Sequence, residues 1–143
     1  MKIIQPNFAK RGGVIPVIVQ DVNSRDILML AYTNEKCFME TIKTGDAIYF
    51  STSRKCRWKK GETTGNTQKV RRILVDCDGD ALIYFVEQNG SGACHTHAYS
   101  CFFRTIGGNT WYAGAKVGKK DILPFVSVSR VKIGWAFVDQ SSI

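Results

Sequence analysis

The sequence predicts a small single domain of the α+β class that is mainly β, with a strongly curved antiparallel sheet and one or two short helices. Three observations lead to this class. Short apolar runs recur between turn signals, one segment has the ends of a helix, and no repeat or low-complexity tract divides the chain. The 143 residues suit one domain that buries its own hydrophobic core.

The predicted strands are short, β-branched or aromatic segments bounded by turn residues. The first covers residues 14–19, and Pro16 inside it predicts a strand at the edge of the sheet. A turn over residues 21–24 follows, and Asp78-Gly79 is a strong hairpin signal farther along. The remaining predicted strands cover residues 27–32, 47–51, 70–75, 81–87, 99–104 and 126–133.

The helix prediction rests on the two ends of one segment. Thr33 or Asn34 can cap a helix over about residues 35–43, and Gly45 lies just past its end. Glycine is common directly after a helix, so both boundaries agree.

Composition favours a cytoplasmic protein. A hydrophobic content of 44% and a charged content of 22% are ordinary for a soluble globular domain. No apolar run reaches the roughly eighteen residues of a membrane span, and residues 1–11 lack the apolar stretch of a signal peptide. Five cysteines, an odd number, favour metal binding or reduced thiols over a disulfide framework.

The net charge of +8 is concentrated in residues 54–72, which hold eight lysines and arginines against one acid, Glu62. Glycines and threonines lie among them, and such a segment forms a mobile loop that offers donors to phosphate. The segment predicts binding of phosphates, either of a nucleic acid or of a small anionic substrate. A solvated basic loop is the alternative.

Three cysteines in the second half, Cys77, Cys94 and Cys101, are candidate zinc ligands. Zinc prefers four tetrahedral positions, so three thiolates leave one position for water, as in a catalytic site. The metal lowers the pKa of that water to about 7. No Cys-x-x-Cys pair occurs, so three unrelated buried thiols are the alternative.

Three aspartates, Asp76, Asp78 and Asp80, alternate around one of these cysteines. On an extended strand they share one side, and their mutual repulsion favours a bound cation such as Mg²⁺. A polar hairpin turn with solvated acids is the alternative interpretation.

The only histidines, His95 and His97, fall between Cys94 and Cys101. His95 is a candidate general base, because a neutral imidazole accepts a proton near pH 7. A fourth metal ligand and a hydrogen-bonded surface histidine are the alternatives.

Six segments together resemble phosphoribosyl-AMP cyclohydrolases over about residues 27–104. They are residues 49–54, 58–68, 75–82, 86–88, 93–96 and 100–104. The order Asp-Cys-Asp-Gly-Asp, Cys-His-Thr and Ser-Cys-Phe is highly specific for this family.

The resemblance implies hydrolysis between N1 and C6 of the purine ring of 1-(5-phosphoribosyl)-AMP, the ring-opening step in L-histidine biosynthesis. It implies Zn²⁺ on the three cysteines, Mg²⁺ on the three aspartates and His95 as the catalytic residue. It also implies an intertwined homodimer whose active sites draw on both subunits. The residues expected to bind the phosphorylated substrate are Ser51, Ser53, Arg54, Trp58, Lys60, Gly61, Glu62, Thr63 and Gln68.

The chain departs from the family pattern at six positions, none of them a proposed metal ligand. Met, Arg, Leu, Ser, His and Gly are usual where this chain has Thr33, Thr52, Arg57, Thr64, Asn66 and His97. Residues 105–143 form an unassigned extension, too short, too glycine-rich and too poor in carboxylates for the pyrophosphohydrolase domain that some relatives carry.

Two other functions compete with this one. The first is a diverged paralogue acting on another N1-substituted purine nucleotide. The second is a zinc-containing module that binds RNA through the basic segment. The acidic cluster argues against nucleic acid, because carboxylates repel phosphates.

Overall fold

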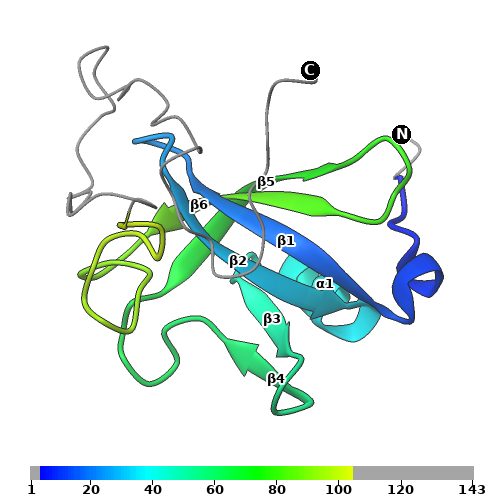
Figure 1. Ribbon diagram of the computed structural model, residues 1–143, viewed down its shortest axis with the longest axis horizontal. Helices are drawn as coiled ribbons and strands as arrows, with labels where there is room; N and C mark the ends of the chain where they lie inside the picture. Colours follow the sequence, from blue (N-terminus) through cyan, green and yellow to red (C-terminus); the bar gives the residue numbers. More distant parts are fainter. Residues whose placement is uncertain (1–3, 105–143) are drawn as a thin grey trace, which may run out of the picture.

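The computed structural model describes residues 4–104, which form two β-sheets, one α-helix and one 3₁₀ turn (Figure 1). No helix in this part of the chain has the length and apolar character needed to cross a membrane. In chain order the elements are η1 (Phe8–Arg11), β1 (Val14–Asp21), β2 (Ile27–Asn34), α1 (Glu35–Thr44), β3 (Ile48–Ser51), β4 (Cys56–Lys59), β5 (Gln68–Val75) and β6 (Leu82–Gln88).

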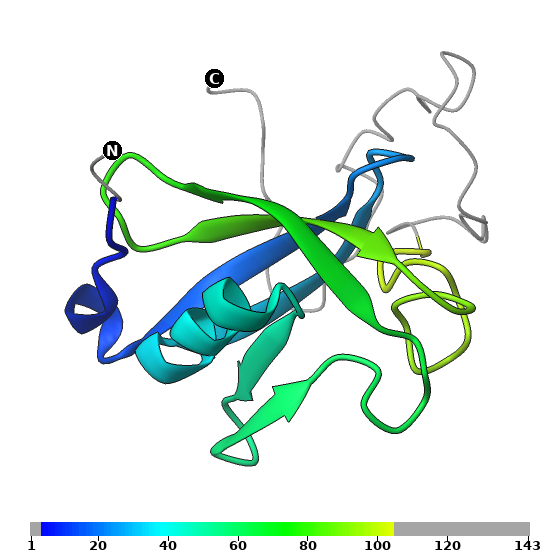
Figure 2. The ribbon, with the colours of Figure 1, turned by 180° about the vertical axis from the view of Figure 1, so that it is seen from behind.

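The larger sheet has the strand order β2-β1-β6-β5, and β3 and β4 form a separate hairpin. The predicted α+β, mainly β class is confirmed. The sheet is nevertheless mixed, because β1 pairs with β6 in parallel while the β1–β2 and β5–β6 pairs are antiparallel. The long β5–β6 hairpin crosses the molecule, so its turn and its open end lie far apart (Figure 2).

The prediction that residues 14–19 form an edge strand is wrong, because β1 lies between β2 and β6. Pro16 is tolerated there because the ladder with β6 begins one residue later, at the pair Val17–Leu82. The missing N–H of proline therefore falls outside that ladder.

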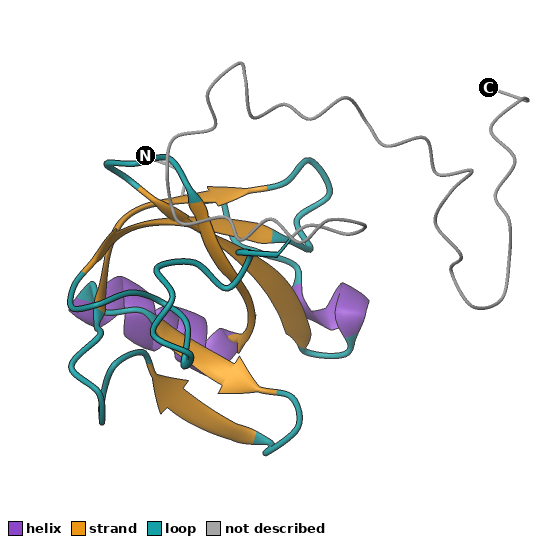
Figure 3. Cartoon of the chain, turned by 60° about the vertical axis from the view of Figure 1, so that its left-hand side comes forward, coloured by secondary structure: helices purple, strands orange, loops and turns teal. Residues whose placement is uncertain are grey.

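Helix α1 has the predicted boundaries. The side chain of Asn34 accepts a hydrogen bond from Cys37 N at 2.9 Å, and Gly45 ends the helix in a left-handed conformation. The helix and the β3–β4 hairpin cover one face of the larger sheet (Figures 2 and 3). The fully buried hydrophobic side chains between these layers include Ile15, Val17, Val19, Leu28, Tyr49, Tyr84 and Val86.

One strand prediction is wrong, and another concerns residues outside the described part of the chain. Residues 99–104 do not form a strand; they close a loop that is fastened to the start of β2. The predicted strand at residues 126–133 lies outside the described residues. Strand β4, in contrast, was hidden inside the predicted basic loop, because two of its four residues, Arg57 and Lys59, are charged.

Asp46 joins the two sheets through two ion pairs. Its carboxylate contacts Lys59 of β4 at 2.6 Å and also Lys69 of β5. The Asp46 side chain is only 19% exposed. The ammonium groups of Lys59 and Lys69 hold the pKa of this carboxyl below its usual value.

We predict that Asp46→Asn lowers the free energy of unfolding at pH 7 by about 1 kcal/mol, the scale of a partly shielded ion pair. Because the folded-state pKa of Asp46 is depressed, its stabilisation is present above the unfolded-state pKa and disappears as pH falls through the folded-state value. Urea unfolding of both proteins at pH 7 and near pH 3 measures this difference. A difference that does not shrink between pH 7 and pH 3 contradicts the electrostatic account.

Candidate functional site

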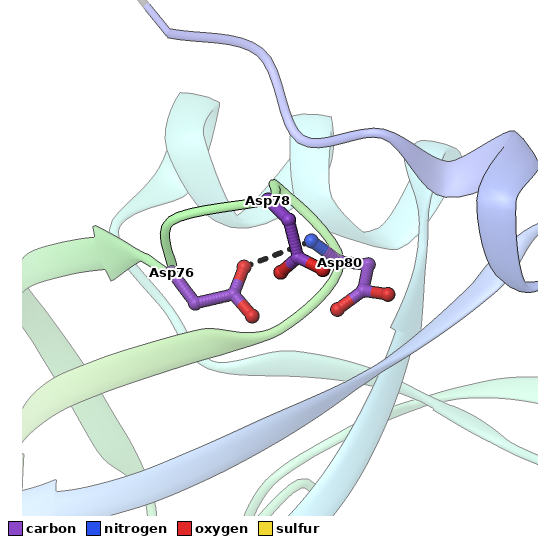
Figure 4. Close-up of side chains that lie close together, drawn as sticks. All are labelled: Asp76, Asp78 and Asp80. Atoms are coloured by element: carbon purple, nitrogen blue, oxygen red, sulfur yellow. Dashed lines mark hydrogen bonds between the residues drawn. The ribbon is translucent and has the colours of Figure 1, made fainter.

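The turn between β5 and β6 gathers the three aspartates (Figure 4). One ligand atom from each of Asp76, Asp78 and Asp80 lies within 4.8 Å of the others. Asp76 Oδ1 accepts hydrogen bonds from the backbone N–H groups of Asp80, at 2.9 Å, and Ala81, at 3.1 Å. The cluster therefore arises from a folded turn and not from the extended strand on which the sequence prediction placed it.

Two cations from η1 reach this acidic turn. Lys10 Nζ contacts Asp78 and lies 3.2 Å from Asp80 Oδ2, and Arg11 Nε lies 2.9 Å from the same oxygen. Lys10 is the main cause of the lowered pKa of Asp78. Burial would raise the pKa of Asp80, but the hydrogen bonds from Arg11 and Lys10 outweigh it and lower it.

The loop over residues 93–101, here called the thiol loop, carries two of the three candidate zinc ligands. Cys94 is buried, and Cys94 Sγ lies 3.0 Å from Thr96 Oγ1. Desolvation and the neighbouring Cys94 raise the pKa of Cys101 to about 11, so the two thiols interact. Two adjacent sulfur donors suit zinc, which binds thiolates.

Cys77 does not join these two thiols within one chain. It is exposed in the β5–β6 turn, while the thiol loop follows the far end of β6 (Figure 1). Seven residues of β6 separate the two places, which corresponds to about 20 Å. Among the described residues, the aspartates are the only group of three or more potential metal ligands that lies together.

The two histidines occupy an exposed turn of the thiol loop. No hydrogen bond or ion pair holds either side chain among the described residues, so both rings face solvent. His97 has φ 68°, a left-handed conformation that favours glycine. This conformation explains why glycine is usual at this position in the family that the sequence resembles.

Part of the predicted substrate-binding set lies at the tip of the β3–β4 hairpin. Ser51 Oγ lies 3.4 Å from Ser53 Oγ and accepts hydrogen bonds from Arg54 N at 3.2 Å and Arg54 Nε at 3.4 Å. The tip therefore gathers the half-buried Ser51 hydroxyl with the exposed Ser53 hydroxyl and Arg54 guanidinium, a donor set suited to an anion.

The aromatic and amide members of the set lie deeper. Trp58 packs against Tyr49 with ring centroids 4.9 Å apart, so its indole is held in one orientation. Gln68 is 1% exposed, and its amide is bonded to Tyr49 Oη and Gln88 Oε1, each at 2.8 Å. Gln68 is thus placed to support the site from beneath.

The loop after β4 closes tightly and approaches the thiols. A Cβ at Gly61 would meet the backbone of Asn66 at 2.4 Å, so only glycine fits this crossing. Lys60 is half-buried and lies close enough to Cys101 and Cys94 to interact with them electrostatically. Glu62 and Thr63 follow in the exposed part of the loop.

Two departures from the family pattern form contacts of their own. Arg57 makes a forked ion pair with Glu40 of α1, through Nη2 at 2.6 Å and Nε at 2.9 Å. Asn66 Oδ1 accepts a hydrogen bond from Ser91 N at 3.0 Å and thereby joins the basic loop to the turn after β6.

Sequence reasoning missed the groups that hold the site in place. Lys10 and Arg11 at the acidic turn, and Asp21 and Tyr99 at the thiol loop, act across long sequence distances. Single positions of this kind carry no local pattern, although a carboxylate at the first residue of a predicted turn is a weak signal for Asp21.

Comparison with known proteins gives a consistent result. The sequence model of the phosphoribosyl-AMP cyclohydrolase family matches residues 29–103. The chain is 59% identical over 97 residues to phosphoribosyl-AMP cyclohydrolase of Archaeoglobus fulgidus, covering 68% of this chain and 89% of that protein. It is 60% identical over 99 residues to phosphoribosyl-AMP cyclohydrolase of Methanoregula boonei, covering 69% and 80%.

A third relative is the histidine biosynthesis bifunctional protein of Aquifex aeolicus, which is 51% identical over 120 residues. That match covers 84% of this chain and 55% of the bifunctional protein. The family match spans just over half of the sequence and includes the acidic turn, Cys77, Cys94 and Cys101. The chain therefore belongs to the phosphoribosyl-AMP cyclohydrolase family.

Proposed function

We propose that the chain opens the purine ring of 1-(5-phosphoribosyl)-AMP by hydrolysis between N1 and C6, a step of L-histidine biosynthesis. The observation that carries this proposal is the family match over residues 29–103, together with 59% identity over 97 residues and 60% over 99 residues to proteins named for this activity. The acidic turn, the thiol loop and the basic hairpin tip all lie within that match.

A homodimer is part of the proposal, and the second face of the larger sheet supports it. The strand registers place Leu30 beside Ile18, Ile18 beside Ile83, and Ile83 beside Leu74. Leu30 is 50% exposed, Ile18 39% and Leu74 36%. An apolar row that crosses four strands in this way marks a contact surface.

The separation of the cysteines supports a second copy of the chain as the occupant of that face. Cys94 and Cys101 supply two soft ligands, and Cys77 of the partner subunit supplies the third. Thiolates fit Zn²⁺, and zinc bound there would supply Lewis acidity that activates water near neutral pH. Three protein ligands leave a position open for chemistry.

The acidic turn is the proposed Mg²⁺ site. Its carboxylate oxygens are hard ligands that suit this ion, and they already lie within 4.8 Å of one another. In the structure, ion pairs with Lys10 and Arg11 offset the negative charge of these carboxylates. Asp78→Asn should weaken Mg²⁺ binding in calorimetric titration, and unchanged affinity would favour the solvated-turn interpretation.

The basic hairpin tip and the following loop are the proposed substrate contacts. Ser51, Ser53 and Arg54 offer donors to a phosphate. Trp58 offers an oriented aromatic surface to the purine, and Lys60 adds positive charge beside the thiols. Gly61, Glu62 and Thr63 shape the loop between them, and Gln68 supports it from the core.

His95 is the proposed catalytic base. Ring opening requires that the attacking water lose a proton and that N1 gain one as its bond to C6 breaks. The imidazole of His95 is exposed, lies next to Cys94, and has no side-chain partner among the described residues that would occupy its nitrogens. It is therefore free to take the proton from water and return it to N1.

An assay with 1-(5-phosphoribosyl)-AMP in the presence of Zn²⁺ tests the reaction directly. When the substrate is supplied at micromolar to millimolar concentrations, we expect an absorbance change that marks formation of the ring-opened product. Turnover only of another N1-substituted purine nucleotide would support a diverged paralogue. Salt-dependent RNA binding without turnover would support the RNA-binding module.

The shared zinc site predicts complementation between two inactive variants. Cys77→Ser and Cys94→Ser proteins should each lose zinc. After they are unfolded together and refolded, about a quarter of the wild-type zinc should return, because half of the dimers are mixed and each mixed dimer keeps one intact site. Zinc analysis by mass spectrometry measures this fraction.

Two matched variants complete this test. Cys56→Ser changes an exposed cysteine of β4 and should keep full zinc. Leu30→Asp places a charge in the apolar row and should give a monomer by light scattering that has all its cysteines but little zinc. Full zinc in the monomer would show that one chain suffices, with the apolar face covered by other residues.

For the catalytic base we expect His95→Ala to keep its zinc and to lose about 10²- to 10⁴-fold in kcat, the usual contribution of a general base. His97→Ala is the control, because its position in the family pattern is usually glycine, and it should keep most of its turnover. Metal analysis and kinetics are done on both proteins. Zinc loss in His95→Ala would make the residue a ligand or a support for one.

A further inference from the structure

The thiol loop is fastened to the β1–β2 hairpin by contacts that no motif of the sequence indicates. Tyr99 Oη donates to Asp21 Oδ2 at 2.6 Å, Ser100 Oγ donates to Ile27 O at 2.7 Å, and Cys101 N donates to Leu28 O at 2.7 Å. Three successive residues, the last of them a proposed zinc ligand, are thus tied to one hairpin.

Asp21 is the centre of this attachment. It is 3% exposed, and its Oδ1 accepts hydrogen bonds from Asn23 N at 2.7 Å and Ser24 N at 2.9 Å. Its second oxygen is left for Tyr99. Because the carboxylate is bonded on both oxygens, it is locked in the hairpin turn and provides a fixed point for the Tyr99 hydroxyl.

The other half of the loop is tied to the same tyrosine through the backbone. Ala93 N donates to Tyr99 O at 2.9 Å, and Cys94 N donates to Ala98 O at 3.1 Å. A Cβ at Gly92 would meet Tyr99 Cα at 2.5 Å, so glycine permits this close approach. The position of Tyr99 therefore bears on both Cys94 and Cys101.

We propose that Asp21 and Tyr99 are positioning residues that fix the separation of the Cys94 and Cys101 sulfur atoms. The hydrogen bond between Tyr99 and Asp21 thereby sets the zinc affinity of the site. This inference rests on the proposed function, since it takes the two cysteines as zinc ligands. Its basis is the chain of contacts from Asp21 through Tyr99 to both cysteine backbones. Groups that orient metal ligands from behind typically contribute about 10- to 100-fold to metal affinity.

The test compares zinc affinities of full-length dimers, measured by competition with a chromophoric chelator. Tyr99→Phe removes only the hydroxyl, and we expect about tenfold weaker zinc binding. Tyr49→Phe is the matched control, because it also removes a buried tyrosine hydrogen bond, that to Gln68 at 2.8 Å, but one that does not join the thiol loop. Its zinc affinity should equal that of the wild type.

The absorption spectrum of the Co²⁺-substituted proteins supplies a second readout, because its bands report ligand geometry and not overall stability. We expect altered bands in Tyr99→Phe. In Asp21→Asn, whose amide keeps the shape but not the charge, we expect a smaller change in the same direction. The two variants allow a conclusion even where one of them folds poorly.

Three results would overturn the inference. Wild-type affinity and spectrum in both Tyr99→Phe and Asp21→Asn would do so while leaving the zinc site intact. Equal weakening in Tyr49→Phe would show a general effect of core stability. Absence of zinc from the wild-type dimer would overturn the proposed function, and this inference with it.

Discussion

Strand β6 holds the two halves of the proposed metal chemistry apart. It pairs with β1 on one side and β5 on the other, and Leu82, Tyr84 and Val86 are almost completely buried. A strand fixed on both edges and packed on one face cannot bend to bring its ends together. The acidic turn with Cys77 and the thiol loop therefore stay at opposite ends, which is why the proposed three-thiolate site draws on a second chain.

The same separation divides most of the candidate ligands by chemistry. The three carboxylates lie with the Cys77 thiol at the turn that precedes β6, and the other two candidate sulfur donors lie in the loop that follows it. Hard carboxylates suit Mg²⁺ and soft thiolates suit Zn²⁺, so each end favours a different ion. Local cations match each end, because Lys10 and Arg11 contact the carboxylates and Lys60 lies beside the thiols.

Local signals in the sequence were sufficient where the structure depends on neighbours in the chain. The Asn34 cap, the Gly45 terminus and the Asp78-Gly79 turn are such signals, and the helix and the β5–β6 hairpin follow from them. The interior position of β1 depends on β6, which is distant in sequence, so Pro16 alone was misleading.

The ligand residues of the candidate site were readable from motifs, but their grouping was not. Sixteen residues lie between Cys77 and Cys94 in the chain, and most of them form strand β6 and its flanking turns. An apolar run between two candidate ligands indicates that the ligands lie far apart, because each residue of a strand adds about 3.3 Å to its length. The predicted strand at residues 99–104 failed because Tyr99, Ser100 and Cys101 bond to the β1–β2 hairpin and not to a ladder.

The apolar row and the separated cysteines are independent observations that support the same proposed partner. Ile83 lies within β6 and within the row, so the exposed face is centred near the strand that separates the cysteines. In a two-fold dimer each subunit presents the same patch to the other. An axis that crosses β6 at right angles, parallel to the sheet, sets the two β6 strands antiparallel and brings the beginning of one toward the end of the other. The proposed homodimer thus brings Cys77 of the partner subunit toward Cys94 and Cys101, so one association buries the apolar face and completes the proposed zinc site.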